Sequence, residues 1–196
     1  MCIYNTMKRC ANREEAEKLY FEYLDRHDEN VWKAFRGYGR ALATCLGVKY
    51  NDLEDLIRVH DKSKRTEKLE IDGYITNFYP YEGDGIGLDE YGIKNAIYEK
   101  ALLSHYHNNP HHPEYWIFFK HNERKLDCKP MEPIYVCEML IDWIANETPN
   151  NMTVDEYWKH NRGSKFLHIN TVDMIDKAID CIIDVRNRFG AKEEEK

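Results

Sequence analysis

The sequence predicts an all-α protein, a bundle of helices without a β-sheet. Apolar residues recur at three- and four-residue steps in several long segments, which is the period of a helix with one buried face. No segment shows the two-residue alternation of a half-buried strand. At 196 residues the chain can bury a sizeable core without disulfides, so we expect one helical domain over 1–196. Within it, 1–11 is a loose lead-in and 190–196 a charged tail.

Start and stop signals divide the chain into helices. Asn12 can cap a first helix, and Gly47 suits the end of a second, longer one. Three glycines and a proline make 80–87 a loop, and the prolines at 130 and 133 suit the opening of a later helix. The predicted helices are 12–24, 25–46, 51–60, 66–79, 88–106, 130–147, 153–160 and 171–189.

Composition and charge argue against several classes of protein. The formal net charge of −7 argues against non-specific binding to nucleic acid or to an anionic membrane. No stretch approaches the ~20 apolar residues that span a bilayer, and no secretory signal is evident. The six cysteines show no C-x-x-C spacing, so neither a zinc ribbon nor a disulfide framework is expected. Reduced thiols in a cytoplasmic protein are the simplest interpretation.

The most distinctive short motif is His60-Asp61-Lys62-Ser63-Lys64. A histidine joined to an aspartate offers a metal ion two ligands from adjacent residues. Lys64 adds a flexible cation suited to a phosphate or another anion. His60 continues the apolar pattern of the 51–60 helix, and His27 lies in register with the apolar stripe of the 25–46 helix. Both rings should therefore point inward. Taken alone, His27 is also explained as a core histidine bonded to a carbonyl or a carboxylate.

The segment 105–116 is the densest polar cluster of the chain. It holds four histidines in eight residues: His105, His107, His111 and His112. The plain alternative is a solvated loop between helices. Against it, the aromatic side chains that follow should draw the segment toward the core: Tyr115, Trp116, Phe118 and Phe119.

Two acids stand one turn apart at the edge of the apolar stripe of the 130–147 helix, Glu138 and Asp142. An acid at that edge needs a partner, either a cation or a metal. For Asp142 a salt bridge or a helix-surface charge is the plain alternative.

Imidazoles and carboxylates are thus expected to face inward from several different helices. Each such group buried without a partner costs ~1–3 kcal/mol, and more when it is charged. A divalent ion (Mn, Fe, Co, Ni, Mg or Zn, as one ion or two) removes this cost by binding their lone pairs. A fully structural alternative pairs the histidines with the carboxylates. The candidate metal ligands are His27, His60, Asp61, His105, His111, His112 and Asp142.

The order of these residues resembles the HD superfamily of metal-dependent phosphohydrolases, whose fold is a helical bundle. The resemblance implies that His27, the His60–Asp61 pair and Asp142 are metal ligands. Asp61-x-x-Lys64 is similar to the H-D-x-x-K form of some members. The additional histidines resemble those of the dinuclear branch, where they complete a second metal site. Whether they bind a second ion, bind substrate phosphate or support the first ion is left open.

A closer similarity is to an HD-like family of bacteria and their phages that is known only as a domain of unknown function. It covers about residues 20–145. The matching segments are Glu29-Asn30-Val31 after His27, His60 to Lys64 followed by Glu67, His105 to Trp116, and Glu138-Met139 with Asp142-Trp143.

The wider resemblance implies a metal-dependent phosphohydrolase that acts on a phosphate monoester or a nucleotide. Lys64 would neutralise charge on the phosphate, and His111 or His112 would protonate the leaving oxygen or bind phosphate. Glu138 or Glu67 would orient the attacking water. Two alternatives stay open: a di-iron oxygenase of the HD type, and a non-catalytic regulator that binds a metal or a nucleotide. The expected partner is a small phosphorylated molecule or nucleotide, and a homodimer also stays open.

Overall fold

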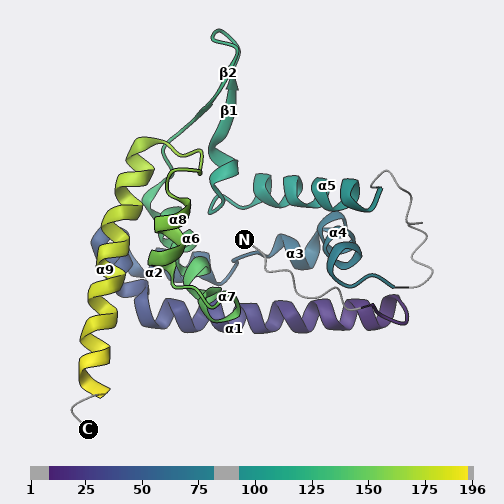
Figure 1. Ribbon diagram of the computed structural model, residues 1–196, viewed down its shortest axis with the longest axis horizontal. Coiled ribbons are helices and arrows are strands. Elements are labelled where there is room, and N and C mark those ends of the chain that lie inside the picture. The colour runs from purple at the N-terminus through teal and green to yellow at the C-terminus, as the bar shows by residue number, and fades with distance from the viewer. Residues whose placement is uncertain (1–8, 82–92, 194–196) are drawn as a thin grey trace. The chain divides into compact units, whose positions relative to one another are not determined.

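The computed structural model describes residues 9–81 and 93–193, and these are mainly helical (Figure 1). The prediction of a mainly α-helical fold is therefore confirmed. Most of the predicted 1–11 lead-in, most of the 80–87 loop and the start of the 88–106 helix lie outside the described residues.

Contacts within the chain divide it into two compact units, each built from two separate stretches. Unit 1 comprises Met1–Asp28 and His60–Asn109, and unit 2 comprises Glu29–Val59 and Pro110–Lys196. Each unit has its own apolar core. The organisation of 1–196 as a single domain stays a prediction.

Helix α1 (Arg13–Leu46) is continuous over 34 residues, although the start and stop signals predict two helices there. Neither glycine nor proline interrupts the chain near residues 24 and 25, so nothing breaks the backbone hydrogen bonds. Asp25 and Asp28 do not begin a new helix. They bind the guanidinium of Arg65 at 2.8 and 2.7 Å.

In unit 1, α4 (Lys68–Phe78) packs against α5 (Ile93–Asn108), and the short α3 (Ser63–Thr66) contacts both (Figure 1). The two longer helices approach closely because Gly73 has no side chain: a Cβ atom there would lie 2.3 Å from the Cβ of Ala101. This packing positions the last turn of α5. The core of unit 1 consists of Cys10, Ala16, Tyr20, Leu24, Tyr74, Ile75 and Tyr79.

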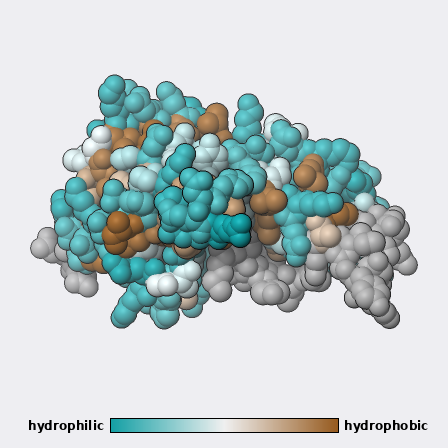
Figure 2. Space-filling model, turned by 90° about the horizontal axis from the view of Figure 1, so that it is seen from above, coloured by the Kyte–Doolittle hydropathy of each residue, from teal (hydrophilic) through white to brown (hydrophobic). Residues whose placement is uncertain are grey.

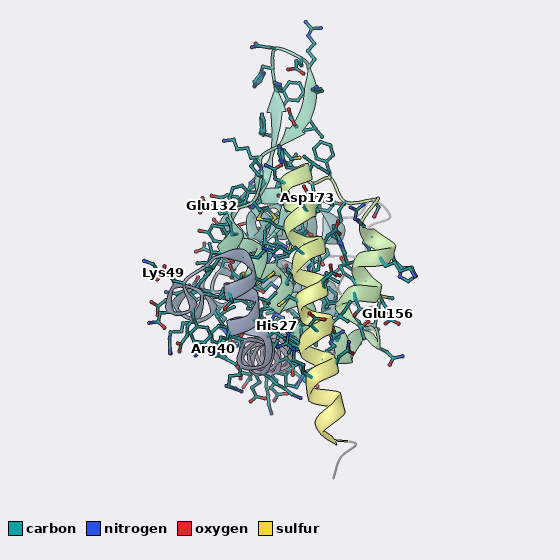
Figure 3. All side chains as sticks on the ribbon, turned by 90° about the vertical axis from the view of Figure 1, so that its left-hand side faces the viewer. His27, Arg40, Lys49, Glu132, Glu156 and Asp173 are labelled. Atoms are coloured by element: carbon teal, nitrogen blue, oxygen red, sulfur yellow. The ribbon has the colours of Figure 1, made fainter. Side chains whose placement is uncertain are left out.

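In unit 2, α6 is the central helix and contacts α2, α8 and α9. Figure 3 shows α9 along its length, with Asp173 near its upper end. Thr153 caps α8 with a capping box: its side chain accepts from the amide of Glu156, whose carboxylate accepts from the amide of Thr153. The helices of unit 2 after α1 are α2 (Tyr50–Ile57), α6 (Pro133–Ala145), α7 (Glu147–Asn150), α8 (Val154–Asn161) and α9 (Ile169–Glu193).

A small antiparallel hairpin, absent from the sequence prediction, follows a 3₁₀ turn (Pro113–Trp116) in unit 2. Strand β1 (Ile117–Lys120) pairs with β2 (Lys125–Cys128), and the hairpin stands clear of the helices of this unit (Figures 1 and 3). Four-residue strands are too short to show alternation. Of the four aromatic residues expected to draw this segment toward the core, Trp116 packs against the core of unit 2. The expectation is wrong for Tyr115, Phe118 and Phe119, which are 43%, 38% and 48% exposed.

Hydrophilic side chains dominate the face shown in Figure 2, where hydrophobic ones form small separate patches. Over residues 9–81 and 93–193, no helix has an apolar stretch long enough to cross a bilayer.

Candidate metal centre

Two predicted ligands lie at a tight turn at the start of the second stretch of unit 1. Helix α2 ends at Ile57, three residues earlier than predicted, so His60 lies in the turn that follows and not on the helix. Asp61 has a φ of 52°, in the left-handed region that few residues other than glycine adopt and that aspartate tolerates. With this backbone, Nε2 of His60 lies 3.6 Å from Oδ2 of its neighbour Asp61.

The carboxylate of Asp61 is the centre of the cluster in unit 1. Its Oδ2 lies 3.9 Å from Nε2 of His27, and its Oδ1 lies 3.3 Å from Nε2 of His105. Together with His60, three imidazoles thus face one carboxylate. All four side chains are at most 6% exposed. The expectation that His27 points inward is confirmed, and His105 of α5 is buried as well.

The spacing of these atoms fits a shared ion. Ligands held about 2.1 Å from a metal lie roughly 3.0–3.4 Å from one another. The separation of Asp61 from His105 lies in this range, and those from His60 and His27 exceed it by a few tenths of an ångström. The ligand atoms of Asp61 and His105 lie within 4.8 Å of each other, as do those of His27 and His60. Neutral imidazoles with one hard carboxylate suit divalent ions such as Zn, Fe, Co, Ni and Mn. The residues of unit 1 are therefore chemically suited to hold such an ion.

Lys64 places a positive charge against the same carboxylate. Its Nζ lies 2.5 Å from Oδ2 of Asp61, and its side chain is 13% exposed. Burial alone would raise the pKa of Asp61, but the charges of Lys64, His60 and His105 outweigh burial and hold this pKa well below its usual range. Asp61 is therefore ionised at neutral pH, as a metal ligand must be. The hydroxyl of Tyr20 donates to the carbonyl of Lys64 at 2.9 Å and ties this segment to α1.

A buried acid that sequence reasoning missed supports His105. Oε2 of Glu70 lies 3.0 Å from Nδ1 of His105, and the carboxylate is fully shielded from solvent. Ser63 donates to Oε2 of Glu70 at 2.8 Å, and the amide of Asn109 donates to Ser63 at 2.8 Å. A carboxylate accepts hydrogen bonds, so Glu70 favours a proton on Nδ1, which would leave the lone pair of Nε2 for a metal ion when one is bound beside Asp61. One signal could have found this acid: Glu70 shares the buried face of α4 with Gly73 and Tyr74, three and four residues further on.

The other candidates of the histidine-rich segment and α6 belong to unit 2. His111 and Glu138 are both buried, and Nδ1 of His111 lies 3.3 Å from Oε1 of Glu138. The ring centroids of His111 and His112 are 4.2 Å apart. Asp142 is half-buried and its Oδ1 accepts a hydrogen bond from the side-chain amide of Asn146 at 3.1 Å. Unit 2 thus brings His111, His112 and Glu138 together.

Two further residues of unit 1 that were considered for the site are exposed. His107 lies on the solvent side of α5, and Glu67 precedes α4 with its side chain in solvent. Within unit 1 neither joins the group around Asp61.

The fold and these residues define a mainly helical protein with a buried cluster of histidines and carboxylates that could hold a metal ion. The chain belongs to the family described as a family of unknown function (DUF5662), whose model matches residues 16–181. Neither the comparison with curated proteins nor the comparison with solved structures gave a match.

Proposed function

We propose that this protein binds a divalent metal ion through His27, His60, Asp61 and His105 and hydrolyses a phosphate monoester or a nucleotide. The observation that supports the metal site most strongly is the arrangement of three buried imidazoles around one ionised carboxylate. The hydrolytic reaction rests on the resemblance of the residue order to HD phosphohydrolases.

The sequence order adds further candidates to this proposal. Asp142 would be a further ligand, and His111 and His112 would bind a second ion or the substrate phosphate. Glu138 would orient water. These four residues belong to unit 2, and their part in the site rests on the sequence pattern alone.

A bound divalent ion would supply two effects, a lowered pKa of bound water and a polarised phosphoryl oxygen. The chain's own residues prepare for this chemistry. Asp61 is held ionised, Glu70 would orient His105 as a ligand through its Nδ1, and Lys64 would provide a cation for a phosphate oxygen next to the ligand set. His111 or His112 would then protonate the leaving oxygen.

Elemental analysis of protein purified without a histidine tag tests the metal site. We expect a stoichiometric divalent metal in the wild type and a loss of most of it in the Asp61→Ala variant. The matched control is Asp55→Ala, whose side chain is 82% exposed. Wild-type protein that stays metal-free after incubation with each candidate ion would overturn the proposal.

A phosphatase screen with the metal-loaded protein tests the reaction. Nucleoside monophosphates and generic phosphate esters are assayed with Mn, Co, Mg, Ni and Fe, and we expect turnover that Asp61→Ala abolishes. Absence of turnover by the metal-loaded protein would favour the alternative that this protein binds a metal or a nucleotide without catalysis. Iron content together with O₂-dependent loss of substrate would select a di-iron oxygenase.

A further inference from the structure

Two thiols from distant parts of the chain meet in unit 2. Cys45 lies in the last turn of α1, and Cys181 lies in α9. Two hydrogen bonds join these helices at this point: Nζ of Lys177 donates to the carbonyl of Cys45 at 2.7 Å, and Sγ of Cys45 lies 3.7 Å from the carbonyl of Lys177. The Cys45 thiol is therefore held against the turn of α9 that precedes Cys181.

The direction of helical side chains brings the second thiol to the same place. In an α-helix each Cα–Cβ bond tilts toward the N-terminus, so the side chain of Cys181 leans back toward the turn that carries Lys177. Burial raises the pKa of Cys181, and the nearby Cys45 thiol raises it further. Both thiols therefore lie on the same side of α9, where it meets the end of α1.

A cleft gives small molecules access to Cys45. It has a volume of about 470 Å³ and is lined by the end of α1, including Cys45, and by the early turns of α9, including Lys177. Both Cys45 and Cys181 are partly exposed. A third thiol nearby, Cys137 of α6, is fully shielded from solvent, and burial raises its pKa to about 12. Cys137 therefore supplies almost no thiolate at neutral pH.

We propose that Cys45 and Cys181 form a reversible disulfide, and that the cleft admits the low-molecular-weight disulfide that oxidises them. The Cys45 thiolate attacks one sulfur of the small disulfide, which forms a mixed disulfide and releases the first thiolate. The Cys181 thiolate then attacks the sulfur of Cys45, which closes the protein disulfide and releases the second thiolate. Two protein thiols are oxidised and one small disulfide is reduced to two thiols, which take up the two protons.

The bond would tie α1 to α9 between positions far apart in the sequence. Closing so long a loop restricts the unfolded chain, so the oxidised protein should be more stable than the reduced protein. This inference is independent of the metal site, because all of its residues belong to unit 2 and none is a proposed ligand.

Oxidation of the reduced full chain with oxidised glutathione tests the pair. The reaction is quenched with acid, remaining thiols are alkylated, and peptides are identified by mass spectrometry. We expect the peptide with Cys45 linked to the peptide with Cys181 at a mass 2 Da below the sum of the two. We also expect Tm to rise by roughly 5–10 °C.

The Cys45→Ser and Cys181→Ser variants should each lose both the linked peptide and the rise in Tm. Cys128→Ser, which alters a thiol on β2, should retain both. Circular dichroism of the reduced variants, compared with the reduced wild type, shows that the serine substitutions leave the fold intact. A linkage of Cys45 to Cys137, or glutathione that stays on Cys45 because Cys181 does not displace it, would overturn the proposal.

Discussion

Nδ1 of His105 lies 3.0 Å from Oε2 of Glu70, and both side chains are shielded from solvent. The opposite nitrogen of the same ring lies 3.3 Å from Asp61. One histidine thus connects a fully buried acid of α4 to the carboxylate at the centre of the candidate metal site. Carboxylates in this position orient a ligating histidine and raise its basicity.

Replacing Glu70 should weaken metal binding without removing a metal ligand. We expect Glu70→Gln, which keeps the size of the side chain, to lower metal affinity by about 10–100-fold. Competition with a chromophoric chelator measures the affinity. Asp72→Asn is the matched control, because Asp72 lies on the same helix and pairs with Arg13 and Lys68 at the surface. If both variants bind metal as the wild type does, Glu70 has no part in the site.

Lys64 should stabilise the metal-free protein and become less important when metal is bound. In the Lys64→Met variant the buried carboxylate of Asp61 loses a positive neighbour at 2.5 Å. We expect the free energy of unfolding of the metal-free variant to fall by about 1–3 kcal/mol. A divalent ion would replace the lost charge, so added metal should raise the Tm of this variant more than that of the wild type.

Lys62→Met provides the comparison, because Lys62 is exposed on the same turn. It should change neither the stability of the metal-free protein nor its response to metal. Equal metal-induced shifts in Tm for Lys64→Met and the wild type would show that the ion does not bind next to Asp61.

The close approach of α4 and α5 gives a prediction about packing. A Cβ atom at position 73 would meet the Cβ of Ala101 at 2.3 Å and the carbonyl oxygen of Ile97 at 3.2 Å. Gly73→Ala should push the helices apart and lower the free energy of unfolding by about 1–3 kcal/mol. It should also weaken metal binding, because α5 carries His105.

Gly37→Ala serves as the control, since a Cβ atom there meets nothing within 4 Å and position 37 is an exposed interior position of α1. This substitution should stabilise the protein by roughly 0.5–1 kcal/mol, because alanine favours the helix. Urea unfolding of both variants measures the difference. A Gly73→Ala variant as stable as the wild type would contradict the packing argument.

The helical segments could be predicted from the sequence, because burial of one helix face makes apolar residues recur at three- and four-residue steps. Capping signals were less reliable, because a side chain that can cap a helix can also bind elsewhere. Asp25 shows this: it is the first residue of a predicted helix, yet in unit 1 it binds Arg65, which lies 40 positions further along the chain. The hairpin was missed because Phe118 and Phe119, two adjacent aromatics, suggest burial more strongly than strand pairing.

The candidate site was predictable only where a polar residue breaks an apolar pattern. His27 interrupts the stripe of α1, and His60-Asp61 is conspicuous as a pair. Glu70 was missed because an acid among the charged residues that open α4 is typical of a solvated helix face. Only the packing of α4 against α5 places it next to His105.

The salt bridge between Arg162 and Asp176 in unit 2 makes part of the stability depend on pH. Hydrogen bonds from Arg162, and next from the indole of Trp158, lower the pKa of Asp176 against the opposing effect of burial. The unfolded chain then binds more protons than the folded chain. The contribution of ionised Asp176 to the free energy of unfolding is fully present above the pKa of about 3.9 that aspartate has in the unfolded chain. It is lost as pH falls through the lower pKa of Asp176 in the folded protein.

Asp176→Asn should therefore be less stable than the wild type at pH 7, and the difference should shrink below about pH 4. Because Asp176 is 39% exposed, we expect a loss of no more than roughly 1 kcal/mol. Urea unfolding at pH 7, 5, 4 and 3 measures it, with Asp180→Asn on the exposed side of α9 as the control. A difference that stays constant down to pH 3 would mean that asparagine disturbs packing, and that the charge of Asp176 contributes nothing to stability.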